Sequence, residues 1–188
     1  MMRFGITGSI ASGKSTAAKI ISRGKLPFFS ADKIVKKLYK NEKFKKSIIK
    51  KLRLKPDKRF SEELSKRIIQ QIKNLDKLEK IIHPLVRKEM FAFFKKNKKK
   101  RIIFCEIPLL VESGLTKYFD KIILIKSNKK IRLKRYKING GDGKLFNLLN
   151  NKQMKDKKKM KFCDYIVVNN VSLSVLKKNI INIINKYE

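Results

Sequence analysis

The sequence predicts an α/β protein built on a five-stranded, parallel, doubly wound sheet with helices on both faces. Five short apolar segments centred near residues 4, 28, 104, 123 and 167 alternate with amphipathic helical stretches, as β-α units do. Residues 101–106 and 121–125 are apolar runs that end abruptly in polar residues, which is typical of buried parallel strands. Residues 31–97 show no strand pattern. We therefore expect one domain over residues 1–188, in which residues 31–97 are long enough to form a helical subregion of their own.

Residues 8–15 read Gly-Ser-Ile-Ala-Ser-Gly-Lys-Ser and fit G-x-x-x-x-G-K-[ST], the phosphate-binding loop or P-loop. The motif stands between a short apolar run and a helical pattern, the strand, loop and helix context that it needs. Gly8 and Gly13 let the main chain wrap a phosphate, which successive N–H groups and the helix N-terminus then bind. Lys14 is expected to reach the β- and γ-phosphates and Ser15 to hold a bridging Mg²⁺. The expected nucleotide-binding residues are Gly8, Ala11, Ser12, Gly13, Lys14, Ser15 and Thr16.

The alternative for this motif is a turn whose glycines only cap a helix, and the combination of residues disfavours it. The motif predicts a nucleoside triphosphate site but does not say what receives the phosphate.

The formal net charge of +35 has two possible explanations. A nucleic-acid-binding protein would gather lysine and arginine on one face, mixed with aromatic residues. Here lysine is scattered over nearly every segment, and isoleucine and asparagine are also abundant. All three have A/T-rich codons, so we favour a genome-wide base bias and expect only weak, non-specific nucleic-acid binding. The positive field should still attract anionic substrates.

Cys105 and Cys163 are far apart, lie in apolar surroundings and form no C-x-x-C pair, so we expect buried, reduced thiols. The N-terminus runs directly into the first strand and leaves no room for a signal peptide. No apolar stretch approaches the ~18 residues of a membrane span. These features predict a soluble, cytoplasmic protein without a membrane partner.

The other elements are predicted from periodicity and from helix breakers. Helices are expected at residues 32–39, 41–54, 61–72, 75–83, 85–94, 128–138, 144–157 and 173–187. Pro-Asp at 56–57 marks a turn. Pro84 lacks an N–H and restricts His83 to extended backbone, so we expect a break or kink there. Residues 107–114 should form a turn and a short helix, and the glycine-rich residues 139–143 a hinge or lid tip.

Asp32 follows a short strand candidate at residues 26–29 and stands at a helix start. Ligands bind at the carboxyl edge of open parallel sheets, so Asp32 is a candidate to orient or deprotonate an acceptor hydroxyl. Aspartate is equally common as a helix cap or first-turn acid. Position alone leaves both interpretations open.

Further side chains are candidates for the same chemistry. Arg135, beside the glycine-rich segment, is favoured over Arg132 to close over phosphates, although either arginine is more commonly found on a solvated helix face. Glu106 ends a strand and either helps to hold Mg²⁺ through water or is a partly exposed strand-end acid. His83, the single histidine, is either structural or a hydrogen-bond donor to a substrate phosphate. Tyr39 is expected to pack in the core rather than on an adenine.

Several motifs stand in a characteristic order along the chain. They are Gly8 to Thr16, Ala31-Asp32 followed by Ile34, Leu78-Glu79-x-Ile81-x-His83-Pro84-x-Val86, and Pro108-Leu109-Leu110-Val111-Glu112. Later motifs are Arg132-Leu133-x-Arg135, Gln153 and Asp164-Tyr165-x-Val167-x-Asn169. In order and spacing the chain resembles the dephospho-coenzyme A kinases over nearly its whole length. The P-loop is shared by very many proteins, whereas the Leu-Glu-to-His-Pro and Pro-Leu-Leu segments are far more selective.

The resemblance implies a P-loop fold with a helical, coenzyme A-side subdomain at residues 40–97 and a small lid at 135–158. It implies transfer of the ATP γ-phosphoryl group to the ribose 3′-hydroxyl of dephospho-coenzyme A, the last step of coenzyme A synthesis. Asp32 matches the base on that hydroxyl, Arg135 a lid arginine, and residues 11–16 the ATP-binding segment.

The chain departs from the family pattern in four places. Ser30 replaces an acid often found two residues before Asp32, and Ala11 replaces a common glycine. The lid carries an unusual Gly-Gly-Asp-Gly, and the arginine often seen just before Gln153 is missing. Ser30 argues against a pair of carboxylates at this point, and Ala11 makes the loop slightly stiffer. The two lid differences bear on lid contacts rather than on the reaction class.

Two rival functions remain. A nucleoside or nucleoside monophosphate kinase would use the same P-loop with a different acceptor. A basic nucleic-acid-binding protein would use the charge instead. A GTP switch is disfavoured, because Asn-Lys-Lys-Ile at residues 128–131 lacks the aspartate of the guanine-reading N-K-x-D motif.

Overall fold

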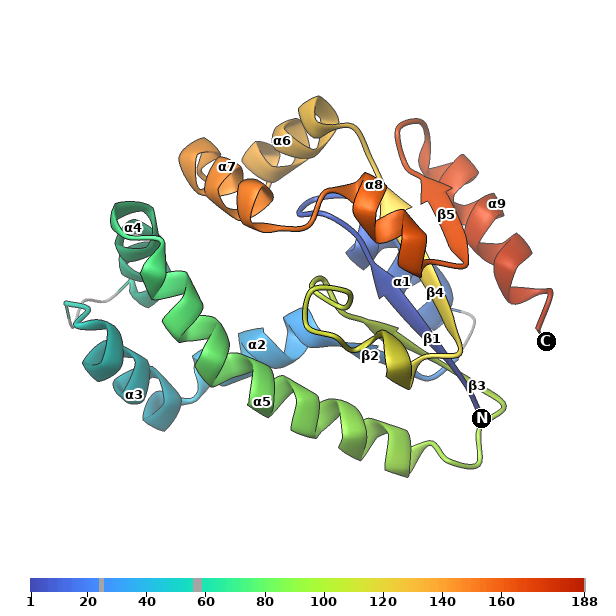
Figure 1. The fold of residues 1–188 in the computed structure, drawn as a ribbon, viewed down its shortest axis with the longest axis horizontal. Coiled ribbons are helices and arrows are strands. Elements are labelled where there is room, and N and C mark those ends of the chain that lie inside the picture. Colours follow the sequence, from blue (N-terminus) through green and yellow to red (C-terminus); the bar gives the residue numbers. More distant parts are fainter. Residues whose placement is uncertain (24–25, 56–58, 188) are drawn as a thin grey trace.

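The computed structural model describes residues 1–23, 26–55 and 59–187, and it has the predicted architecture (Figure 1). A five-stranded, all-parallel sheet has the strand order β2-β3-β1-β4-β5. The strands are β1 (Met2–Thr7), β2 (Phe28–Ser30), β3 (Ile102–Glu106), β4 (Lys121–Lys126) and β5 (Tyr165–Val168). Each strand falls on an apolar segment that the sequence assigned to one, so the predicted fold class is confirmed.

The register of the sheet brings the carboxyl ends of three strands together. Ile6 of β1 pairs with Glu106 of β3, and Ser30 of β2 pairs with the same Glu106. The chain leaves β1 at Thr7 and enters the P-loop directly. The loop therefore lies at the edge of a doubly wound sheet where ligand sites form.

Two apolar clusters cover the two faces of the sheet. Along β3, Ile102 and Phe104 belong to one cluster and Ile103 and Cys105 to the other, because successive strand residues point to opposite faces. Helices α1 (Lys14–Arg23) and α9 (Leu173–Ile184) contribute to the first cluster. The C-terminal half of α5 (Lys73–Lys96) packs into the second.

A third apolar cluster lies away from the sheet, in the helical part of the molecule. It joins α2 (Ala31–Lys40), α3 (Glu42–Leu52), α4 (Phe60–Gln70), the N-terminal half of α5 and α7 (Gly143–Lys152). In the described residues between 31 and 97 the structure has helices and no strand, as predicted. The predicted turn at residues 56–57 lies outside the described residues. Asn41 ends α2 and caps α3 by accepting a hydrogen bond from Phe44 N–H, so the helices are separate.

The sequence predicts a break or kink at His83 and Pro84, and the break is wrong. Helix α5 runs without interruption through Pro84, and His83 is helical. A proline inside a helix costs about 3 kcal/mol, but both halves of α5 are packed into apolar clusters. Leu78 packs in the third cluster and Met90 in the second. Burial of each such side chain contributes roughly 1.5–3 kcal/mol, which outweighs the lost hydrogen bond.

Two predicted helices in the C-terminal half also need correction. Residues 107–114 form turns without the expected short helix, and a 3-10 helix, η1 (Thr116–Tyr118), follows. Helix α6 (Lys129–Ile138) forms as predicted. The helix expected at residues 144–157 ends at Lys152, because Gln153 is extended. A short helix, α8 (Asp156–Lys159), and a 3-10 helix, η2 (Met160–Phe162), follow it.

Both cysteines are free, as expected. Cys105 is buried, but Cys163 is only partly buried, so the prediction of two buried thiols is wrong for Cys163. Within the described ranges no helix is long and apolar enough to cross a membrane.

Candidate active site

The P-loop has the backbone that its glycines were expected to allow. Gly8 has φ of 150° and Gly13 φ of 103°. A Cβ atom at Gly13 would lie 2.1 Å from Asn169 Nδ2, and one at Gly8 would lie 2.3 Å from Ile125 O. Ala11 has φ of 57°, a left-handed conformation that is strained for an L-residue with a side chain. Glycine adopts a positive φ without this strain, so a glycine at position 11 is accommodated more easily than Ala11.

Lys14 is buried beneath the P-loop. Its Nζ donates hydrogen bonds to Gly8 O (2.9 Å) and Ser9 O (3.1 Å). Burial lowers the pKa of the amine, while the nearby carboxylates of Asp32 and Glu106 act to raise it. A lysine held at this point supplies positive charge where a bound polyphosphate would lie.

Glu106 is almost fully buried at the end of β3, with 1% of its surface exposed. Ser30 Oγ donates to Glu106 Oε2 (2.7 Å) and Ser15 Oγ to Oε1 (3.3 Å). Burial raises the pKa of this carboxyl, the Ser30 hydrogen bond opposes that rise, and Asp32 adds to it. The alternative of a partly exposed strand-end acid is therefore wrong. Ser30 also caps α2 through Lys33 N–H.

These oxygen atoms suit Mg²⁺, which prefers hard oxygen ligands. The Ser15 hydroxyl lies against the Glu106 carboxylate, beside a cavity that Asp32 lines. Among the described residues no group of three or more His, Cys, Asp or Glu side chains is arranged to hold a metal ion. The pairing of one hydroxyl with one carboxylate fits Mg²⁺, because the ion usually takes one or two protein ligands and completes its shell with water and phosphate.

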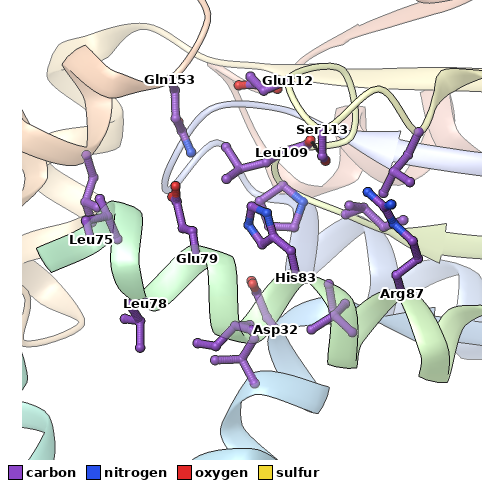
Figure 2. A pocket seen from close by; sticks show the side chains of 18 of the residues that line it. Asp32, Leu75, Leu78, Glu79, His83, Arg87, Leu109, Glu112, Ser113 and Gln153 are labelled. Carbon is purple, nitrogen blue, oxygen red and sulfur yellow. Dashed lines mark hydrogen bonds between the residues drawn. The ribbon is translucent and has the colours of Figure 1, made fainter. Parts of the chain in front are cut away.

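Two cavities meet at this edge of the sheet. The first, which we name the loop cavity, has a volume of about 630 Å³ and is lined by residues 10–16 with Asp32, Pro108, Arg135, Asn139 and Gln153. The second, the helix cavity, has a volume of about 550 Å³ and follows α5 and the 107–115 segment (Figure 2). Its walls are mostly apolar. The residues that line both are Ile10, Asp32, Pro108 and Gln153.

Asp32 is exposed and lies where the two cavities join. It is in the first turn of α2, whose N-cap is Ser30 rather than Asp32. The carboxylate is therefore free to face a ligand, although its place in the first turn also suits the helix dipole. The structure thus brings Asp32 together with Lys14 and the P-loop, as the sequence suggested.

His83 lines the helix cavity from α5, one helical turn from Glu79 and one from Arg87. Burial lowers the pKa of the imidazole, with opposing effects from Glu79 and Arg87. It therefore faces the cavity as a neutral hydrogen-bonding group at neutral pH. Tyr39 both packs in the third cluster and lines the same cavity, and burial raises the pKa of its hydroxyl to about 12.

The two arginines of α6 both lie at the P-loop. Arg135 lines the loop cavity and donates to Asn169 O (3.1 Å). Arg132 is buried and donates to Ile10 O (3.2 Å) and to Asn150 Oδ1 (2.9 Å). The expectation of a solvated helix face is wrong for Arg132, which joins the P-loop to α7.

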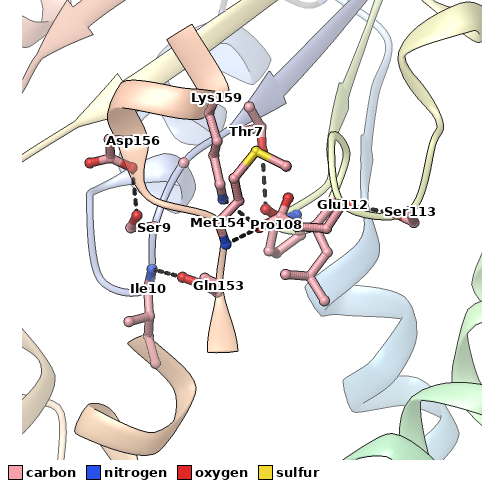
Figure 3. Close-up of polar contacts among 12 residues, drawn as sticks. Thr7, Ser9, Ile10, Pro108, Glu112, Ser113, Gln153, Met154, Asp156 and Lys159 are labelled. Carbon is pink, nitrogen blue, oxygen red and sulfur yellow. Dashed lines mark hydrogen bonds and ion pairs between the residues drawn. The ribbon is translucent and has the colours of Figure 1, made fainter. Parts of the chain in front are cut away.

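Residues 153–159, which we name the strap, hold the P-loop from outside (Figure 3). Gln153 Oε1 accepts from Ile10 N–H (2.9 Å), and Asp156 Oδ1 accepts from Ser9 Oγ (2.6 Å). In the sequence, Gln153 stands out only as part of a family pattern, and Asp156 does not stand out. No local periodicity marks these residues, because their partners lie far away in the sequence.

The strap is also tied to the wall of the helix cavity. Glu112, which lines that cavity, accepts a hydrogen bond from Met154 N–H (3.1 Å). Its Oε1 lies 2.8 Å from Nζ of Lys159, whose side chain is fully buried. Thr7 Oγ1 donates to Pro108 O (3.0 Å) and holds the same wall against the end of β1. The strap therefore connects the two cavities.

A P-loop at the carboxyl edge of a parallel sheet, with a second cavity that shares an exposed carboxylate, defines the class of P-loop kinases. Comparison with known proteins narrows the class. A model of the dephospho-CoA kinase family matches residues 2–174, so the chain belongs to that family and is an ATP-dependent kinase.

Relatives match over nearly the full chain. The chain is 30% identical to the dephospho-CoA kinase of Rickettsia bellii over 197 residues, which cover 100% of this chain and 98% of that protein. It is 36% identical to the dephospho-CoA kinase of Bartonella quintana over 172 residues, which cover 89% and 88%. The solved structure of the dephospho-CoA kinase from Campylobacter jejuni superposes with a TM-score of 0.66 at 26% identity, covering 98% of this chain and 96% of that one.

Proposed function

We propose that this protein transfers the γ-phosphoryl group of ATP to the ribose 3′-hydroxyl of dephospho-coenzyme A, which completes coenzyme A. The observation that most supports this proposal is that Asp32 lines both the loop cavity and the helix cavity. A carboxylate in that place faces a donor held by the P-loop and an acceptor lying along α5. Family membership supports the choice of acceptor.

In the proposed mechanism, main-chain amides of the P-loop and the Lys14 amine hold the donor polyphosphate in the loop cavity. Arg135, which lines the same cavity, adds charge on the transferred group. Asp32 orients the acceptor hydroxyl and takes its proton as the oxygen attacks the γ-phosphorus. The new O–P bond forms as the bond from the γ-phosphorus to the β,γ-bridging oxygen breaks, and ADP leaves.

Mg²⁺, when bound, neutralises charge on the β- and γ-phosphates. Ser15 is its proposed protein ligand, and Glu106 would act through water or through its hydrogen bond to Ser15. Residues 135–158 are the proposed lid, because Arg135 and Gln153 from this segment line the loop cavity. Residues 40–97 are the proposed acceptor subdomain, and His83 a proposed hydrogen-bond donor to the acceptor. The proposed location is the cytoplasm.

The test is an ADP-release assay with dephospho-coenzyme A, adenosine and AMP as separate acceptors. We expect dephospho-coenzyme A to be used far more efficiently than the other two. Faster turnover with AMP or adenosine would instead identify a nucleotide or nucleoside kinase. A duplex-binding measurement near physiological salt tests the nucleic-acid alternative, for which the proposed function predicts only weak, non-selective binding.

The role of Asp32 is tested by Asp32→Asn beside the matched control Lys33→Met, an exposed neighbour on the same helix. Asp32→Asn should cut turnover roughly 10²-fold or more and leave ATP binding nearly intact, because a general base contributes on that scale. Lys33→Met should change neither. If Asp32→Asn turns over like the wild type, Asp32 is only a first-turn acid.

A further inference from the structure

The helix cavity is long and its two ends differ in chemistry. Along α5 its lining residues run from Leu75 to Met90, a span of about 22 Å at 1.5 Å per helical residue. Figure 2 shows Asp32 between the Leu75 end and the Arg87 end. The Leu75 end combines the apolar and aromatic side chains of Leu78 and Tyr39 with charged groups. A ligand that reaches Asp32 must therefore extend toward one end, the other, or both.

The positive charges at the two ends are not equivalent. At the Leu75 end, Lys152 forms an ion pair with Asp76 and lies 2.8 Å from Glu79 Oε2. That lysine is already neutralised by two carboxylates. An added anion there would also lie beside Glu79, which lines the cavity.

At the other end, Arg87 lines the cavity without such a partner. Within the described part of the chain, no ion pair or hydrogen bond of the Arg87 side chain is found. It lies one helical turn, about 5.4 Å, beyond His83 on the same face of α5. Arginine binds phosphate groups in a bidentate, charge-assisted manner. The cavity thus offers a free guanidinium one turn beyond the imidazole.

We propose that Arg87 binds the diphosphate of the acceptor and so fixes the direction in which the acceptor lies along α5. The inference rests on the proposed function, because it places the ribose 3′-hydroxyl at Asp32. On a nucleoside 5′-diphosphate the base is attached at C1′ and the 5′-carbon at C4′, on either side of the ring oxygen, so the base and the diphosphate extend from the ribose in different directions. With the diphosphate at Arg87, the adenine lies toward Tyr39 and Leu75. The pantetheine arm extends past Arg87 toward Met90 and Leu115.

This orientation also matches the surfaces at each end. The flat adenine meets an aromatic ring and leucine side chains, which bury it well. The arm, a flexible chain of amides that ends in a thiol, meets Met90, Ser113 and Leu115. His83, between Asp32 and Arg87 along the cavity, is placed to donate to the same diphosphate. Arg87 is therefore proposed to select acceptors that carry a diphosphate.

The test is isothermal titration of the full-length protein, saturated with a non-hydrolysable ATP analogue, with dephospho-coenzyme A and separately with adenosine. Arg87→Met removes the charge and keeps the length of the side chain. It should weaken dephospho-coenzyme A binding about 10- to 100-fold, the scale of lost charge-assisted hydrogen bonds, and leave adenosine affinity within about twofold. Arg87→Lys should recover part of the loss. Lys88→Met, an exposed neighbour outside both cavities, is the control and should bind like the wild type.

Three results would overturn the inference. The first is an unchanged affinity of Arg87→Met for dephospho-coenzyme A. The second is a fall in the affinity of Arg87→Met for adenosine as large as the fall for dephospho-coenzyme A. A loss in Lys152→Met with none in Arg87→Met would place the diphosphate at the opposite end. Failure of the proposed function looks different, because the wild-type protein would then neither bind nor phosphorylate dephospho-coenzyme A. The melting temperature of each variant shows that it is folded.

Discussion

The ion pair of Lys159 and Glu112 allows a stability change to be worked out from the structure. The lysine is fully buried, and its partner carboxylate is 19% exposed and 2.8 Å away. Lys159→Met fills the space of the side chain but leaves a largely buried carboxylate with only Met154 N–H as a donor. Breaking a buried pair costs about 3–5 kcal/mol. Because Glu112 keeps some contact with water, we expect the lower end, about 3 kcal/mol.

The loss would appear in both urea and thermal unfolding. For a chain of this length, about 3 kcal/mol corresponds to a fall of roughly 6–12 °C in melting temperature. The double variant Glu112→Gln/Lys159→Met removes both charges and keeps an acceptor for Met154 N–H. It should therefore recover most of the loss, with a coupling energy well above that of distant sites. Lys158→Met, an exposed neighbour, is the control and should unfold like the wild type.

Two outcomes would refute this reasoning. One is a single variant that loses less than about 1 kcal/mol, the scale of an exposed pair. The other is a double variant as unstable as Lys159→Met alone, which would mean that the loss comes from packing rather than from an unpaired charge.

Three further predictions follow from conformation and pKa. Ala11→Gly relieves a left-handed residue and should raise the free energy of unfolding by about 0.5–1 kcal/mol, measured in urea. Glu106→Gln should stabilise the protein at pH 7, because burial raises the pKa of this carboxyl above its ordinary 4.5 and so penalises the charged form in the folded protein. The gain in the free energy of unfolding should vanish below pH 4.5. Turnover of the variant should fall and require a higher Mg²⁺ concentration. Burial also lowers the pKa of His83 below 6.5, so as the pH falls this histidine is protonated in the unfolded chain before it is protonated in the folded one. The wild type therefore loses stability as the pH falls. In urea unfolding between pH 7.5 and 5, His83→Gln should lose less stability than the wild type.

The parts of the site that were predictable are those encoded locally. Gly8, Gly13 and Lys14 lie in one short motif whose spacing fixes both the backbone and the chemistry. Asp32 could be placed because it directly follows a strand, and the ends of parallel strands meet at one edge. The five strands were found for a similar reason, since buried strands are short, apolar and bounded by polar residues.

The parts that were missed depend on contacts between distant segments. Arg132 and Ile10, joined by a hydrogen bond, are 122 residues apart, and the partners of the strap are equally remote in sequence. A charged helix such as α6 looks solvated until its neighbours are known. Pro84 shows the same limit, because local rules predict a break and packing at both ends of α5 overrides them.

The continuous hollow formed by the two cavities has a consequence for inhibitor design. Because Ile10, Asp32, Pro108 and Gln153 border both spaces, one compound could occupy the nucleotide side and the acceptor side at once. Tethering two weak fragments turns the second contact into an intramolecular event at high effective concentration. A bisubstrate compound with a short linker over Asp32 should therefore bind far more tightly than either fragment alone.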